Sequence, residues 1–107
     1  MTYGKPWALL LPAAKTRKRR NDMDLSDWRA RIDTVDQVLV DLLNRRMRYA
    51  LEIGKIKRDH GRQIYDAGRE KAVLDGLKAY NQGPIGDKAI DDIFSRIIAA
   101  ARDLEEA

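Results

Sequence analysis

The chain has 107 residues, contains no cysteine and carries a formal net charge of +4. We expect a chain of this length to form one small domain, with no room for a second catalytic domain. The lack of cysteine excludes disulfides and thiolate metal sites, and the cytosol is then the expected compartment. A single histidine, His60, argues against a histidine-based triad or a zinc cluster.

The positive charge is concentrated near the N-terminus. Residues 1–22 contain six basic residues and one acidic residue, whereas residues 23–107 contain 15 basic and 16 acidic residues. The KTRKRR run can bind phosphate, but such runs are also common in solvated tails. The apolar stretch WALLLPAA is too short to cross a membrane, and its charges follow it, unlike those of a secretory signal. We therefore expect a basic tail or leader over 1–22 and a folded domain over 23–107, with Met23 as an alternative start.

One long helix is predicted from Leu25 to about Lys57. Asp24 or Ser26 can cap its first turn, and Gly61 follows its expected end. Such a helix is about 50 Å long, longer than a domain of this size is wide, so a partner chain is expected. Its apolar residues recur at steps of three and four, like the seam of a coiled coil. They are Leu25, Trp28, Ile32, Val35, Leu39, Leu42, Tyr49, Ile53 and Ile56.

Two shorter helices are predicted in the remainder. Asp66 stands at the N-cap position of the second, which Asn81, Gly83 and Pro84 end. The third covers about 87–105. The apolar stripe of the second is Val73, Leu74 and Leu77; that of the third is Ile90, Ile93, Phe94, Ile97, Ile98, Ala101 and Leu104. No stretch alternates with period two, so we predict an all-α fold of three helices, the first much the longest.

Arg46 and Lys57 share one face of the first helix. They are 11 residues apart, close to three turns, so they point the same way about 16 Å apart along the axis. Two cations placed in this way can bind an anion that lies between them. The ordinary alternative for Arg46 is an internal ion pair, because burying its guanidinium without a partner is costly. The ordinary alternative for Lys57 is a solvated surface position.

Other polar residues suggest a site without a cofactor. Asp66, Arg69 and Glu70 form one patch at i, i+3 and i+4, which a cap and a local salt bridge would also explain. Glu105 shares the apolar stripe of the third helix, unless it is merely an exposed helix end. The sequence contains no Gly-rich phosphate loop, no serine triad order and no dinucleotide fingerprint. A helical site rich in Arg and Lys can still catalyse reactions that need only orientation and electrostatic stabilisation.

Six motifs follow one another along the chain: W-R-x-x-I-D-x-x-D, L-L-N-R-R-M, I-G-x-x-K, I-Y-D-x-x-R-E, N-x-G-P and I-F-x-x-I-I. In these motifs and their spacing the chain resembles the all-helical class (type II) of chorismate mutases. The resemblance covers about 80 of the 107 residues and leaves out only the tail. It implies an intertwined homodimer that converts chorismate to prephenate in aromatic amino acid biosynthesis, without a cofactor.

The resemblance also implies roles for individual residues. Arg46 and Arg29 would bind the carboxylates of chorismate, and Lys57 would contact the ether oxygen whose bond breaks. The implied substrate-binding residues are Arg29, Arg46, Lys57, Asp66, Arg69, Glu70 and Glu105, of which Lys57, Arg46 and Glu105 would be catalytic. Arg29 is 17 residues before Arg46, which is about 26 Å along a helix and a rotation of about 100°. We therefore expect Arg29 to serve the site of the partner subunit.

Two departures from the family pattern fall in the third helix. Well-known members have a serine and, four residues later, a glutamine where this chain has Ala101 and Glu105. The serine contact is therefore lost. The glutamine donates a hydrogen bond to the ether oxygen, which an ionised Glu105 cannot do.

Three interpretations follow. The first is a chorismate mutase, in which Glu70 would hold the ring hydroxyl of the substrate, and Asp66 with Arg69 would shape the edge of the site. A lyase of the same fold removes pyruvate from isochorismate, but the D-x-x-R-E run fits the mutase better. The third interpretation is a non-catalytic helical interaction or nucleic-acid-binding module that uses the basic tail. For the enzyme we expect neither a membrane nor a nucleic acid partner.

Overall fold

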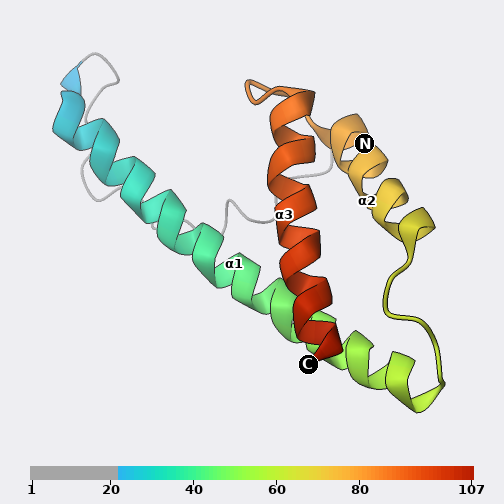
Figure 1. Cartoon of the computed structure of the whole chain (residues 1–107). Helices are drawn as coiled ribbons and strands as arrows, with labels where there is room; N and C mark the ends of the chain where they lie inside the picture. Colours follow the sequence, from blue (N-terminus) through green and yellow to red (C-terminus); the bar gives the residue numbers. More distant parts are fainter. Residues whose placement is uncertain (1–21) are drawn as a thin grey trace, which may run out of the picture. The chain divides into compact units, whose positions relative to one another are not determined.

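A computed structural model describes residues 22–107 of the chain, so the predicted tail up to residue 21 lies outside the described residues. Within the described range the fold is all-α, as the sequence predicts. Its helices are α1 (Leu25–Asp59), α2 (Ala67–Tyr80) and α3 (Asp87–Glu106) (Figure 1). None of them combines the length and the apolar character that crossing a bilayer requires. The chain divides within α1 into two compact units, of which the second comprises residues 45–107.

Both ends of α1 have the capping interactions that the sequence predicts. The Asp27 N–H donates to Asp24 Oδ1 at 2.9 Å, and the Asp24 N–H donates to the Asp27 carboxylate at 3.2 Å. This reciprocal pair satisfies amides that the first turn leaves free. After the last turn, Gly61 has a φ of +64°, and the Arg62 N–H donates to the Lys57 carbonyl at 2.8 Å. Glycine adopts this left-handed conformation at little cost, so α1 ends close to the predicted position.

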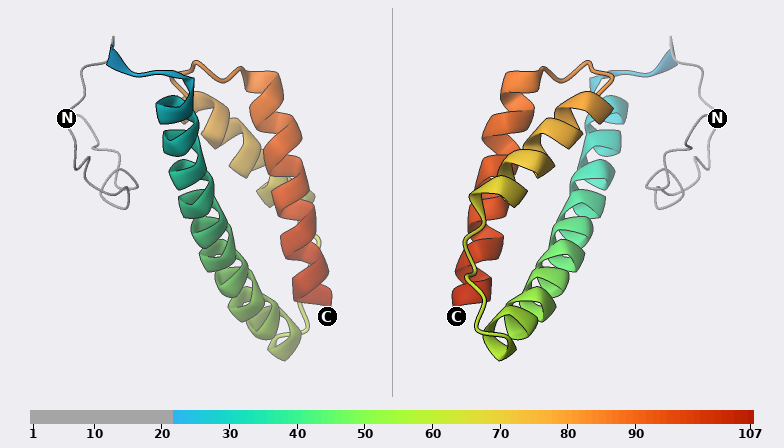
Figure 2. Two further views of the ribbon diagram at one scale, coloured as in Figure 1. Left: turned by 90° about the vertical axis from the view of Figure 1, so that its left-hand side faces the viewer. Right: turned by 90° about the vertical axis from the view of Figure 1, so that its right-hand side faces the viewer.

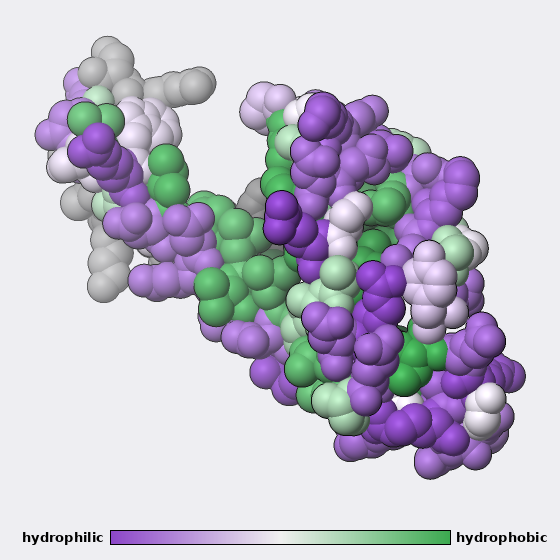
Figure 3. All heavy atoms as spheres, viewed as in Figure 1, coloured by the Kyte–Doolittle hydropathy of each residue, from purple (hydrophilic) through white to green (hydrophobic). Residues whose placement is uncertain are grey.

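The described part of the first unit is the start of α1, and its apolar stripe is open to solvent. The side chains of Leu25, Ile32 and Leu39 are 63%, 58% and 50% exposed. Figure 3 shows hydrophobic side chains at the surface along α1. The predicted stripe is therefore present, and in the single chain it is largely uncovered.

In the second unit α2 packs against α3 (Figure 2). Asp66 caps α2 as predicted, because its Oδ1 accepts from the Arg69 N–H at 2.9 Å. Ile98 and Ala101 of the α3 stripe are buried, which agrees with the prediction. Ile93 is the exception, since 47% of it is exposed. The predicted apolar stripe of α3 is wider than the face of α3 that is buried within one chain. Ile93 lies at the edge of that stripe.

The second half of α1 meets the last turn of α3 at Gly54. A Cβ atom on Gly54 would lie 3.0 Å from the Cα of Glu105 and 3.1 Å from its carbonyl oxygen. One turn later Arg58 donates from Nη1 to the carbonyl oxygens of Glu105 and Ala107. Carbonyls in the last turn of a helix lack hydrogen-bond donors within that helix, and Arg58 supplies donors to them. Gly54 and Arg58 together attach the end of α3 to α1.

This contact predicts opposite effects for two Gly→Ala substitutions. Gly54→Ala should lower the free energy of unfolding by about 1–3 kcal/mol, because the added methyl group meets the backbone of α3. Gly76→Ala should raise it by about 0.5–1 kcal/mol, because a Cβ there meets nothing within 4 Å and alanine favours a helix. Urea unfolding followed by circular dichroism, at equal chain concentrations, measures both. Equal effects of the two substitutions would contradict the close approach at Gly54.

Candidate active site

A cavity of about 390 Å³ lies within the second unit, a size that suits a small molecule. In each helix the lining residues recur at i, i+3, i+4 and i+7 or close to it, which places them on one helical face. From α1 these are Arg46, Tyr49, Ala50, Ile53 and Lys57. From α2 and the connection before it they are Ile64, Asp66, Arg69, Glu70 and Val73. From α3 they are Ile98, Ala101, Arg102 and Glu105.

The cavity brings together most of the residues that the sequence singles out. The predicted binding residues that line it are Arg46, Lys57, Asp66, Arg69, Glu70 and Glu105. Arg29 belongs to the first unit and is not part of this lining. The cavity is therefore lined by the polar residues that the sequence singles out at the second and third helices. Arg46 and Lys57, which share one face of the first helix, also line it.

Two arginines in the cavity have side chains that no described residue neutralises. Arg46 is half-buried and forms no hydrogen bond or ion pair with any residue in 22–107. Arg69 bonds to the Asp66 side chain through its backbone N–H, and its guanidinium has no partner in the same range. Within the part of the chain that the structure describes, an internal ion pair is thus not the explanation for Arg46. No residue of that part occupies either guanidinium group, so both can bind an anion.

Lys57 is held in place and is not a solvated surface lysine. Its Nζ donates to the Ile64 carbonyl at 2.9 Å and lies 3.5 Å from Glu105 Oε2. Only 23% of its side chain is exposed. An ammonium group has three donors, so one remains for a ligand in the cavity.

Glu105 is not the exposed helix end that the sequence allowed as an alternative. Its side chain is 12% exposed, its Oε2 lies 3.5 Å from Lys57 Nζ, and both residues line the cavity. The contacts of Gly54 and Arg58 with its backbone explain this position, because they hold the last turn of α3 on α1.

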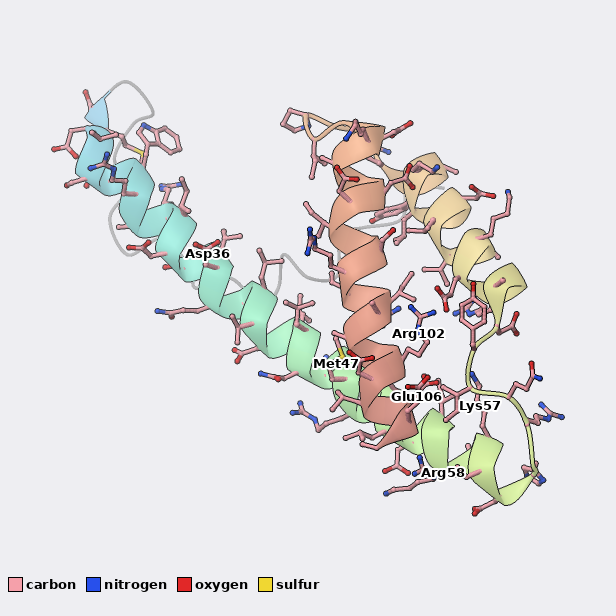
Figure 4. All side chains as sticks on the ribbon, viewed as in Figure 1. Asp36, Met47, Lys57, Arg58, Arg102 and Glu106 are labelled. Carbon is pink, nitrogen blue, oxygen red and sulfur yellow. The ribbon has the colours of Figure 1, made fainter. Side chains whose placement is uncertain are left out.

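Arg102 is a cavity residue that the sequence analysis missed. Its Nη1 lies 3.2 Å from Glu70 Oε2, and its guanidinium carbon lies 4.9 Å from the centroid of the Tyr65 ring. Figure 4 shows the side chain extending from α3 toward α2. The spacing of residues in the third helix could have revealed Arg102, because it lies four residues after Ile98 and three before Glu105. These positions share one helical face.

The charges of the cavity suit a small dianion. Its four cationic side chains face three carboxylates, and two of the cations pair with Glu70 and Glu105. The arginines at positions 46 and 69 remain free within the described residues. Apolar side chains, including Ile53, line the wall between the charges. Charge interactions are stronger beside an apolar wall than in bulk water.

Comparison with known proteins places the chain in a family. Residues 28–106 match the family model of chorismate mutase type II. The chain belongs to the type II chorismate mutase family. This membership agrees with the resemblance found in the sequence, and it favours neither the lyase nor the nucleic-acid-binding interpretation.

Relatives of this type II chorismate mutase chain include longer proteins. The T-protein of Haemophilus influenzae is 36% identical over 76 residues, which are 69% of this chain and 20% of the relative. A bifunctional chorismate mutase/prephenate dehydratase of Neisseria gonorrhoeae is 34% identical over 68 residues, which are 64% of this chain and 18% of the relative. The chain thus spans about a fifth of the length of these relatives.

A solved structure of similar size supports the same assignment. The chorismate mutase (form II) of Thermus thermophilus superposes with a TM-score of 0.75 and is 36% identical in sequence. The match covers 77% of this chain and 93% of that one. The fold and the family are therefore consistent with each other.

Proposed function

We propose that this chain catalyses the conversion of chorismate to prephenate, without a cofactor, in cytoplasmic aromatic amino acid biosynthesis. The observation that carries the proposal is the pair of guanidinium groups, Arg46 and Arg69, that have no partner among residues 22–107 and lie in a cavity that also contains Lys57. Chorismate carries two carboxylates, so it complements this excess of positive charge. Membership of the type II chorismate mutase family supports the same reaction.

The reaction needs little covalent chemistry from the protein. In this [3,3] rearrangement the ether C–O bond breaks while a C–C bond forms, and no proton has to be moved. A catalyst can therefore act by holding the reactive conformation and by stabilising charge that develops at the ether oxygen. The position of Lys57, fixed by Ile64 and Glu105, suits it for stabilising that charge.

The remaining cavity residues would hold the substrate. Arg46 would bind one of its carboxylates, and Glu70 would accept a hydrogen bond from its ring hydroxyl. Asp66 and Arg69 would shape the edge of the site, where Asp66 is already engaged in capping α2. We propose that residues 23–107 form the catalytic domain and that residues 1–22 are a tail outside it. The family match, which begins at residue 28, is compatible with this division.

We also propose that the enzyme is a homodimer in which Arg29 serves the cavity of the partner subunit. The exposed stripe of α1 supports this, because burying each large apolar side chain contributes about 1.5–3 kcal/mol. A second copy would offer the same stripe to cover it. The cavity described above is lined without Arg29, so a partner can supply this arginine.

The first activity prediction concerns the two cations on the cavity face of α1. Lys57→Ala and Arg46→Ala should each lower kcat/KM by about 100-fold or more, or about 2.7 kcal/mol, while the fold is retained. The control is Lys55→Ala, because Lys55 is exposed, pairs with Glu52 and does not line the cavity. Conversion of chorismate and identification of its product provide the measurement. A folded Lys57 or Arg46 variant with the wild-type rate would remove that residue from the site.

The shared site predicts complementation between two inactive variants. Chains with Arg29→Ala and chains with Arg46→Ala should each be nearly inactive, but a mixture of them should regain activity. Each mixed dimer would contain one site in which both arginines are present. Activity is measured after subunit exchange has been shown by mass spectrometry of differently tagged chains. If exchange occurs and the mixture stays inactive, each site is built within one chain.

Glu105 stands where a hydrogen-bond donor to the ether oxygen is needed. A carboxylate accepts hydrogen bonds and does not donate them, whereas the amide of a glutamine side chain donates. Glu105→Gln supplies such a donor with nearly the same shape and should raise kcat/KM at neutral pH about tenfold or more. Conversion of chorismate by the two folded proteins provides the measurement. A variant rate equal to or below that of the wild-type chain would mean that the donor is another group.

A further inference from the structure

Arg102 connects three segments of the second unit at the edge of the cavity. From α3 it pairs with Glu70 of α2, with Nη1 3.2 Å from Oε2. Its guanidinium carbon also lies 4.9 Å from the centroid of the Tyr65 ring, in the connection before α2. Arg102 and Glu70 both line the cavity. The pair is therefore part of the site and not of the outer surface.

The surroundings of this pair fix its geometry. The side chains of Arg102 and Glu70 are 30% and 27% exposed, so solvent screens them less than it screens a surface pair. The ring of Tyr65 attracts the guanidinium group through its π electrons. Because the guanidinium is planar and its donors are rigidly arranged, contact with the ring restricts the directions in which its N–H groups point. Arg102 thus presents a donor to Glu70 along a defined direction.

The Glu70 carboxylate has one oxygen left over. Among residues 22–107 its only side-chain hydrogen bond comes from Arg102, to Oε2. A carboxylate accepts at both oxygens, so Oε1 is available to a donor in the cavity. A glutamate side chain without a partner has several freely rotating bonds, and ordering it opposes binding. The bond from Arg102 removes part of that freedom before a ligand arrives.

We propose that Arg102 is a positioning residue that holds Glu70 so that Oε1 accepts the hydrogen bond from the ring hydroxyl of the substrate. The proposal rests on the proposed function, in which Glu70 binds that hydroxyl. It makes Arg102 a determinant of how well the site recognises a hydroxylated ring. If Arg102 instead bound a substrate carboxylate itself, its contribution would not depend on Glu70.

A double-mutant cycle tests this dependence. Arg102→Met should lower kcat/KM about tenfold in the wild-type background, because Glu70 is no longer held in place. In a Glu70→Gln background, whose amide lacks the charged acceptor, the same substitution should have almost no further effect. Arg102→Lys keeps a cationic donor and should restore part of the loss. Circular dichroism and thermal unfolding of each variant separate these effects from a loss of folded protein.

Arg96→Met is the matched control, because Arg96 is an exposed arginine of the same helix that does not line the cavity. It should leave kcat/KM unchanged. Equal losses from Arg102→Met in both backgrounds, or no loss in either, would overturn the positioning role while the proposed function stands. A wild-type chain that does not convert chorismate would overturn the proposed function and the role of Arg102 with it.

Discussion

The approach of α1 to the last turn of α3 is the constraint on which the candidate site depends. At Gly54 the two backbones are so close that a methyl group would not fit without movement, and Arg58 bonds the carbonyls at the end of α3. A helix end frays unless its free carbonyls find partners. Because this end is attached, Glu105 lies beside Lys57 instead of in solvent. A backbone contact outside the cavity thus determines which charges face each other inside it.

The same attachment explains how a small unit organises a polar cavity. Lys57 is held by a backbone carbonyl of the connection and by a carboxylate of α3. Glu70 is held by Arg102, again across two helices. Each of these charged groups therefore has its direction set by a different segment of the chain. Groups that are oriented in advance need little reorganisation when a substrate binds, and this is how electrostatic catalysis gains most of its effect.

Local patterns in the sequence predicted the helices, whereas contacts between helices were harder to predict. The caps at Asp24 and Asp66 depend on nearby residues, so both starts were correct. The face shared by Arg46 and Lys57 follows from helical periodicity. By contrast, the bond from Arg102 to Glu70 joins residues 32 apart, and no local rule relates them. The exposure of Ile93 also depends on how much of α3 its neighbours cover, which periodicity does not give.

Arg46 shows how such a site trades stability for binding. An unpaired guanidinium beside apolar side chains lowers stability, because burial removes hydration that nothing replaces. Arg46 is half-buried in this way, and no residue in the described range compensates its charge. An anionic substrate would supply the missing partner, so part of its binding energy would come from relieving this cost. A site for a dianion therefore requires positively charged side chains that protein carboxylates do not neutralise. The pairing of Glu70 with Arg102 contributes to this, because it leaves Glu70 less able to neutralise Arg46 or Arg69.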